Sequence, residues 1–72
     1  MATREGQRLV KAASRGDAAA QLALGRLYLE GGEGLGANPN AALNWLVRAW
    51  KGGRAEAARE IAEHIPPPPR FQ

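Results

Sequence analysis

The sequence lacks cysteine altogether and has a single histidine, His64, among its 72 residues. Without cysteine, neither a disulfide nor a thiolate metal site can form, and the redox compartment cannot be inferred. His64 has no second imidazole with which to share a metal ion, so we expect no metal site. A chain of this length buries only about 60 % of the surface that its unfolded form exposes. We therefore expect marginal stability, supplied by packing alone or with the help of a partner.

Long apolar runs are missing as well. No stretch approaches the roughly 20 apolar residues that span a membrane. The N-terminus carries charges at Arg4, Glu5, Arg8 and Lys11 where a secretory signal would have an apolar run. These absences predict a cytoplasmic protein with no membrane partner. The net charge of +3 permits acidic partners without requiring nucleic acid.

Residue patterns that carry catalysis are also scarce. Ser14 has no evident partner for a catalytic triad. Glu30 and Glu33 flank glycines, but this loop lacks the Gly-Lys-Ser ending of a phosphate-binding loop. The sequence therefore predicts no catalytic residue, no cofactor, no metal and no small-molecule substrate. We expect that the protein is not an enzyme.

What the sequence does contain is an internal repeat with an offset of 37 residues. The matched pairs are Leu9/Leu46, Val10/Val47, Ala12/Ala49, Gly16/Gly53, Ala18/Ala55 and Ala20/Ala57. A period of this length, read as helix, loop and helix, is typical of α-solenoids. In such folds each helix pair buries its apolar face only by stacking on a neighbour.

Local signals divide the chain into four predicted helices, at residues 3–14, 18–30, 39–51 and about 54–64. Asp17 and Asn38 are expected N-caps, and Pro39 suits the first position of the third helix. Glycines end the first three helices, and the prolines at 66–69 end the fourth. We expect an all-α domain over residues 1–65, with the strongly apolar third helix at its centre, followed by a proline-rich tail at 66–72.

The pattern of small and aromatic residues resembles the Sel1-like repeat, a relative of the tetratricopeptide repeat. The matching residues are Gly16, Ala20, Leu24, Gly25, Tyr28, Gly31, Gly34, Leu35, Ala42, Trp45, Ala49 and Gly53. The resemblance covers one full unit and half a unit on each side. The chain departs from the family in an extra glycine at 31–34, in Asn38 where Asp is usual, and in Trp50 where Ala is usual.

This resemblance implies a short right-handed α/α solenoid of about four helices. It also implies a non-catalytic protein–protein interaction adaptor or scaffold of the bacterial type, whose motif residues serve packing. Small residues such as Gly25 would let neighbouring helix backbones approach closely, so a Gly25→Leu change should overpack the core by roughly 1–3 kcal/mol.

Polar residues replace apolar ones in the two outer helices. Aligned by the same offset, these replacements are Glu5, Gly6 and Arg8 in the first helix and Arg59, Glu60, Glu63 and His64 in the last. Terminal repeats need such polar outer sides, so we expect a complete miniature solenoid with its own caps. Because about three repeats are usually needed for stability, oligomerisation or a partner chain would help it fold.

Two charged stripes are candidate interaction sites. Arg4, Arg8, Lys11 and Arg15 are spaced to share one side of the first helix. This side is either an anion-facing surface or an ordinary solvated one. The residues Glu56, Glu60 and Glu63 form an acidic stripe on the last helix. The basic helix of one copy could meet the acidic helix of another, which would give a homo-oligomeric ring or filament.

Three apolar residues are further candidates for binding a partner. Leu22 and Leu29 fall off the stripe that contains Leu24, so they either form a small exposed patch or contact the glycine loop or the tail. Trp50 either packs over the end of the solenoid, which we favour, or anchors a partner.

The leading hypothesis is an adaptor that binds a protein partner or self-associates. The alternative is a basic accessory module that contacts nucleic acid or an acidic polymer through the first helix, with nucleic acid the less favoured partner. The tail is a further alternative: it is either a polyproline II ligand for an aromatic groove or, as we favour, a helix stop after which Phe71 folds back.

Overall fold

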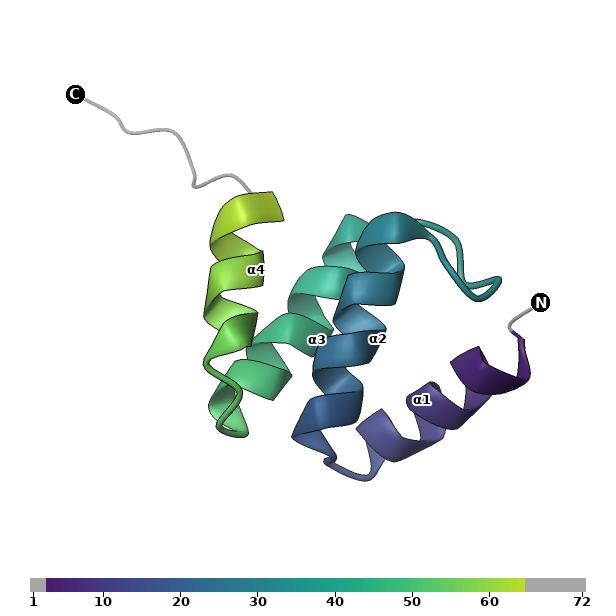
Figure 1. Ribbon diagram of the computed structural model, residues 1–72, viewed down its shortest axis with the longest axis horizontal. Coiled ribbons are helices and arrows are strands. Elements are labelled where there is room, and N and C mark those ends of the chain that lie inside the picture. Colours follow the sequence, from purple (N-terminus) through teal and green to yellow (C-terminus); the bar gives the residue numbers. More distant parts are fainter. Residues whose placement is uncertain (1–2, 65–72) are drawn as a thin grey trace.

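The computed structural model describes residues 3–64. It contains four α-helices, α1 (Arg4–Ser14), α2 (Ala18–Glu30), α3 (Pro39–Lys51) and α4 (Glu56–His64), and the described residues form no strand (Figure 1). This confirms the all-α prediction. The expected proline-rich tail lies outside the described residues. Within them, no helix is both long and apolar enough to cross a membrane.

Side-chain caps explain where the first three helices begin. Thr3, Asp17 and Asn38 each precede a helix, and the side chain of each accepts a hydrogen bond from the backbone N–H three residues later, at 3.1–3.2 Å. Each bond satisfies a donor that has no partner inside the helix, which contributes about 1 kcal/mol. The caps predicted at Asp17 and Asn38 are thereby confirmed.

The fourth helix begins later than the sequence predicts. Its first helical residue is Glu56, whereas the pattern placed the start near Arg54. The backbone N–H of Arg54 instead bonds the carbonyl of Ala49 at 2.9 Å, in the turn that leaves α3. The backbone N–H groups of Ala57 and Ala58 each bond the carbonyl three residues back, so the turn at Glu56 is tighter than an α-helical turn.

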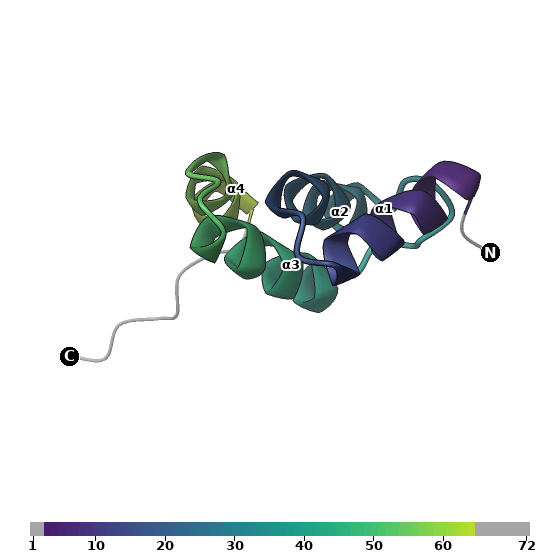
Figure 2. The same cartoon turned by 90° about the horizontal axis from the view of Figure 1, so that it is seen from below.

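The helices pack in chain order, with α1 and α4 at opposite ends of the molecule (Figure 1). Seen from below, α4, α2 and α1 follow one another, while α3 crosses on one side of α2 and α4 (Figure 2). α2 packs against each of the other three helices. It therefore shares the central position that the sequence assigned to the third helix.

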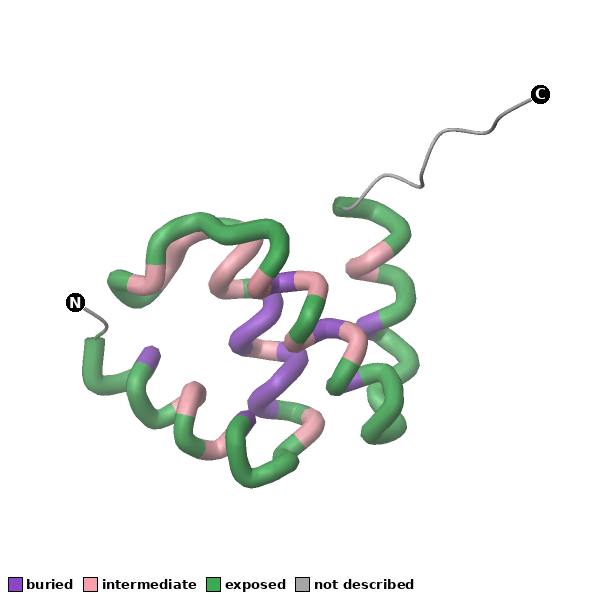
Figure 3. The backbone as a smooth tube through the Cα atoms, turned by 180° about the vertical axis from the view of Figure 1, so that it is seen from behind, coloured by how far each residue is buried: buried purple, intermediate pink, exposed green. Residues whose placement is uncertain are grey.

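Two apolar clusters lie on either side of α2. The α1-side core contains buried Ala13, Ala20 and Leu24, with Leu9, Val10, Ala12, Tyr28, Leu35 and Trp45 packed against it. The α4-side core contains buried Leu22, Leu46, Ala49 and Ala57, with Leu29 and Ile61 packed against it. The buried positions follow α2 and α3 through the middle of the molecule (Figure 3).

A glycine allows α2 and α3 to approach closely between the two cores. A Cβ atom built on Gly25 would lie 2.7 Å from Cγ of Leu46 and 3.3 Å from the carbonyl oxygen of Ala42. Both of these α3 residues are fully buried. The small residue at position 25 is therefore required by the distance between the helices, as the repeat pattern predicted.

The glycine-rich loop between α2 and α3 is tied to both ends of the α1–α2 pair. The backbone N–H of Asn38 donates to the carbonyl of Tyr28 at 2.8 Å, and that of Thr3 donates to the carbonyl of Glu33 at 2.9 Å. The Thr3 hydroxyl also donates to the Glu33 carboxylate. Leu35 packs against the α1-side core from this loop. The loop therefore joins the start of α1 to the end of α2.

Candidate interaction surfaces

Leu22 and Leu29 belong to the core rather than to an exposed patch. Leu22 is only 6 % exposed, in contact with Leu46, Ala49 and Ala57, and Leu29 is partly buried against the same cluster. Of the two alternatives, the exposed patch is wrong for Leu22, and the other buried residues of its described cluster belong to α3 and α4 rather than to the glycine loop. The polar residue at the position of the terminal helix α4 that corresponds to Leu22 suggested an exposed side, but α2 packs against three helices and so buries more of its circumference.

Trp50 lies on the surface, contrary to the favoured expectation that it is buried. Its exposed fraction is 53 %, the largest among the big apolar residues described. α4 packs against α3 through the side that bears Leu46 and Ala49. Trp50 lies beyond that contact, near the end of α3.

An apolar stripe on α3 continues from Trp50. Leu43 and Val47 precede Trp50 by seven and three residues, so the three side chains share one side of the helix over about 10 Å. Leu43 and Val47 are partly exposed, and none of the three belongs to either described core cluster. We call Leu43, Val47 and Trp50 the α3 stripe.

Four basic residues follow the outer side of α1. Arg4, Arg8, Lys11 and Arg15 are all exposed. The buried side of the same helix bears Gly6 and Ala13, and at about 100° per residue the basic side chains project from the opposite side. We call these four residues the basic face. The structure thus brings them together as their spacing predicted.

The basic face carries little compensating charge. Its one described ion pair joins Arg8 Nη1 to Glu5 Oε2 at 3.9 Å, between two well-exposed side chains. Such a pair contributes less than about 1 kcal/mol. Three of the basic residues and Gln7 surround a shallow hollow on this surface. A chain of like charges with so little neutralisation attracts anions from solution.

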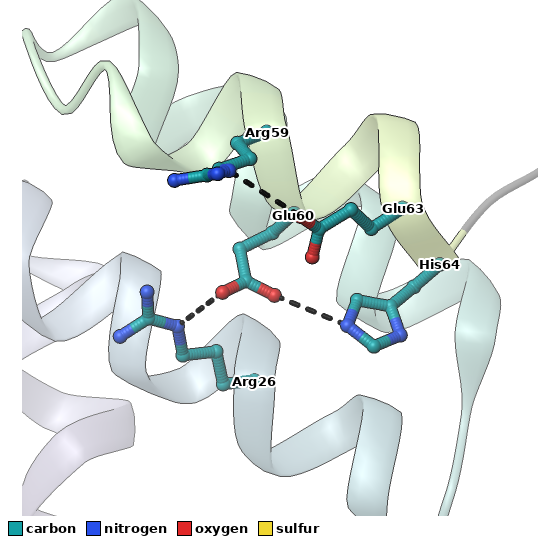
Figure 4. A network of polar contacts seen from close by, with 5 residues as sticks. All are labelled: Arg26, Arg59, Glu60, Glu63 and His64. Carbon is teal, nitrogen blue, oxygen red and sulfur yellow. Dashed lines mark hydrogen bonds and ion pairs between the residues drawn. The ribbon is translucent and has the colours of Figure 1, made fainter.

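The acidic stripe of α4 is already paired within the chain (Figure 4). Arg26 Nε of α2 lies 2.9 Å from Glu60 Oε1, and His64 Nε2 lies 3.3 Å from Glu60 Oε2. Glu60 is the most buried of these groups, with 19 % of its side chain exposed. This ion pair ties α4 to α2, so Glu60 is engaged inside the molecule rather than free to meet another copy.

The other two acidic residues also have a cation nearby. Arg59 Nε lies 3.3 Å from Glu63 Oε1, and Arg54 Nη1 lies 3.9 Å from Glu56 Oε2. The electrostatic attraction expected between this stripe and the basic helix of another copy is therefore reduced.

The end of α4 also gathers metal-ligating groups. Glu60, Glu63 and His64 each offer a ligand atom, and these atoms lie within 4.8 Å of one another. This cluster was not predicted from the sequence, where His64 has no second imidazole or cysteine beside it and Glu60 and Glu63 were assigned to the acidic stripe. Arg26 and Arg59 already engage its two carboxylates. The described geometry is thus that of an ion-pair network.

Two interactions in the structure were not predicted from the sequence. The side chain of Gln21 is buried, and its Nε2 donates to the carbonyl of Ala13 at 3.0 Å, which links α2 to the end of α1. The only signal was a polar residue within the apolar run of α2. The guanidinium of Arg48 lies 4.9 Å from the ring centre of Trp45, a cation–π contact between consecutive turns of α3.

No family model matches this sequence. The search of solved structures likewise found no match to the fold.

Proposed function

We propose that this protein is a non-catalytic interaction module that binds a helical segment of a partner protein along the α3 stripe. The exposure of Trp50 carries the proposal. Tryptophan is enriched among the residues that dominate binding energies at protein interfaces, and exposed apolar patches mark such sites.

The arrangement of the α3 stripe favours a helix as the bound element. Leu43, Val47 and Trp50 lie along two turns of α3, and an amphipathic helix recognises a partner through anchors at the same spacing. The neighbouring exposed residues Asn44 and Lys51 supply a polar edge. A partner helix with an apolar stripe and an acidic flank complements this surface.

The repeat supports the same proposal at the level of architecture. In a short α/α solenoid of the Sel1-like kind, each helix pair stacks on the next. The full unit here is α2 and α3, followed by α4 as a half unit, and the α3 stripe belongs to no described core cluster. A partner helix at this position would continue the stacking. The adaptor role implied by the resemblance rests on this site.

Covering Trp50 supplies a substantial part of a binding energy. A tryptophan offers about 150–250 Å² for burial, and roughly half of its surface is exposed here. At about 25 cal/mol per Å², its burial contributes about 2–3 kcal/mol. Truncating it should therefore weaken binding by about 30-fold or more.

The experiment begins with affinity capture on the full chain. The wild type is compared with Trp50→Ala and with Arg48→Ala, a control that also changes an exposed residue of α3 but on another side of the helix. We expect a polypeptide that the wild type and the control retain and that Trp50→Ala releases. Titration of that polypeptide then measures the loss of affinity.

Sedimentation of the three proteins without a partner tests the alternative of self-association. A monomer is expected for all of them. A wild-type dimer that the Trp50→Ala change dissociates would show that the α3 stripe binds a second copy of this chain rather than another protein. Equal retention of every captured polypeptide by Trp50→Ala and by the control would refute the α3 stripe as the binding surface.

A further inference from the structure

We propose that the basic face of α1 binds the phosphate backbone of a nucleic acid duplex. This surface is separate from the α3 stripe, and the inference does not depend on the function proposed above. It rests on the distribution of charge, on the geometry of the basic face and on the residues that this face lacks.

The whole net charge of the protein resides in α1 and its C-cap residue Arg15. Residues 4–15 hold four of the ten basic residues and one of the seven acidic residues, for a charge of +3. The remaining six basic and six acidic residues cancel. The ion pairs of α4 make this cancellation local. The long-range attraction for a polyanion therefore originates at α1.

The basic face forms a straight row on an outer helix. Its four residues extend over about 16 Å of the helix, on the side opposite buried Gly6 and Ala13. α1 lies at one end of the molecule, where its outer side projects away from the other helices (Figures 1 and 2). A convex helix about 10–12 Å across fits against the groove and flanking strands of a duplex.

Charge density favours a nucleic acid over an acidic protein. Along 16 Å, a duplex presents about ten phosphates, whereas the matching side of a peptide helix presents about four carboxylates. Three of the four residues in the row are arginines, whose planar guanidinium binds phosphate oxygens through two parallel hydrogen bonds. The basic face offers no apolar side chain to insert into a lipid surface.

The absence of aromatic side chains on the basic face favours a duplex over a single strand. Proteins that bind single strands stack bases on aromatic rings. In the described part of the chain, the aromatic residues are Tyr28 and Trp45, which pack against the α1-side core, and Trp50 on α3. The contacts available at the basic face are thus those to the backbone, which carry affinity without reading sequence.

Fluorescence anisotropy with a labelled 20-base-pair DNA duplex tests the proposal on the full chain. Four phosphate contacts predict a linear plot of the logarithm of the association constant against the logarithm of the salt concentration, with a slope of about −3.6. Binding should therefore weaken about 150-fold between 50 and 200 mM salt. The double variant Arg8→Gln, Lys11→Gln should reduce this slope to about −1.8.

The double variant Lys51→Gln, Arg54→Gln is the matched control because it removes the same charge from exposed positions near the end of α3. It should keep a slope close to that of the wild type. Circular dichroism should show the same helix content in both variants. The α1 variant should melt no lower than the wild type, because it removes repulsion between like charges.

Three outcomes would overturn the proposal. The first is no binding to the duplex at 50 mM salt, and the second is an equal loss of slope in both double variants. The third is displacement of the protein from the labelled duplex by another polyanion that is as effective as unlabelled duplex at equal total charge. The competitors are polyglutamate, a single-stranded oligonucleotide and vesicles of anionic phospholipid, which represent an acidic protein, a single strand and a membrane surface.

Discussion

The contact between Gly25 and α3 makes the sharpest prediction about stability. Replacing Gly25 with alanine adds one methyl group in the middle of α2. In a helix interior this change is intrinsically stabilising by about 1 kcal/mol, because alanine loses less backbone entropy than glycine. The added Cβ would, however, lie 2.7 Å from Cγ and 2.8 Å from Cδ2 of Leu46. Steric overlap therefore opposes the helix propensity.

The packing around Leu46 decides which effect prevails. Its side chain is fully buried, and the carbonyl oxygen of Ala42 closes another side of the space at 3.3 Å from the added atom. Overpacking costs about 1–3 kcal/mol, and contacts as short as 2.7 Å with a fully buried side chain place this change in the upper part of that range, at about 2–3 kcal/mol. The gain of about 1 kcal/mol in helix propensity offsets part of this cost. We therefore expect Gly25→Ala to lower the free energy of unfolding by about 1–2 kcal/mol, which for a domain of this size lowers the Tm by roughly 5–15 °C.

Thermal and urea unfolding followed by circular dichroism measure this change. Ala19→Gly, at an exposed position in the first turn of the same helix, reports the propensity alone and should cost at most about 1 kcal/mol. Leu46→Ala should cost about 2–5 kcal/mol in the parent but less in the Gly25→Ala background, because the two changes share one space. A Gly25→Ala variant as stable as the parent, or more stable, would refute the close helix approach.

Two further predictions concern a turn and an ion pair. Gly31→Ala should destabilise by about 1–3 kcal/mol in urea unfolding, because φ is +80° and the new Cβ would lie 2.9 Å from a backbone nitrogen. At Gly36, φ is +77° and a new Cβ would have no atom within 4 Å, so Gly36→Ala should show only the cost of the strained backbone conformation. Equal losses of stability in the two variants would contradict the steric contact at Gly31. Glu60→Gln should cost up to about 1 kcal/mol at low salt and less at 1 M salt, because it weakens the half-exposed ion pair with Arg26. Glu63→Gln is the control, because Glu63 pairs within α4. An equal loss of stability in the two variants would contradict a stabilising role for the Arg26–Glu60 ion pair between α2 and α4.

The sequence by itself determined the helices and several of their ends. Asp17 and Asn38 identify helix starts through local hydrogen bonds, which depend on residues only a few positions away. A small residue at position 25 was also expected from the resemblance to the Sel1-like repeat. The basic face followed from spacing, because four residues at intervals of four, three and four share a side of any α-helix.

Tertiary structure alone decided which apolar sides are covered and which charges are paired. Leu22 is buried in a cluster that residues of α3 and α4 complete, whereas Trp50, four residues after buried Leu46, remains exposed near the end of α3. Glu60 pairs with Arg26, which lies 34 residues away in the chain. Such outcomes depend on the positions of whole helices, and residue periodicity specifies the sides of one helix without specifying which neighbour covers them.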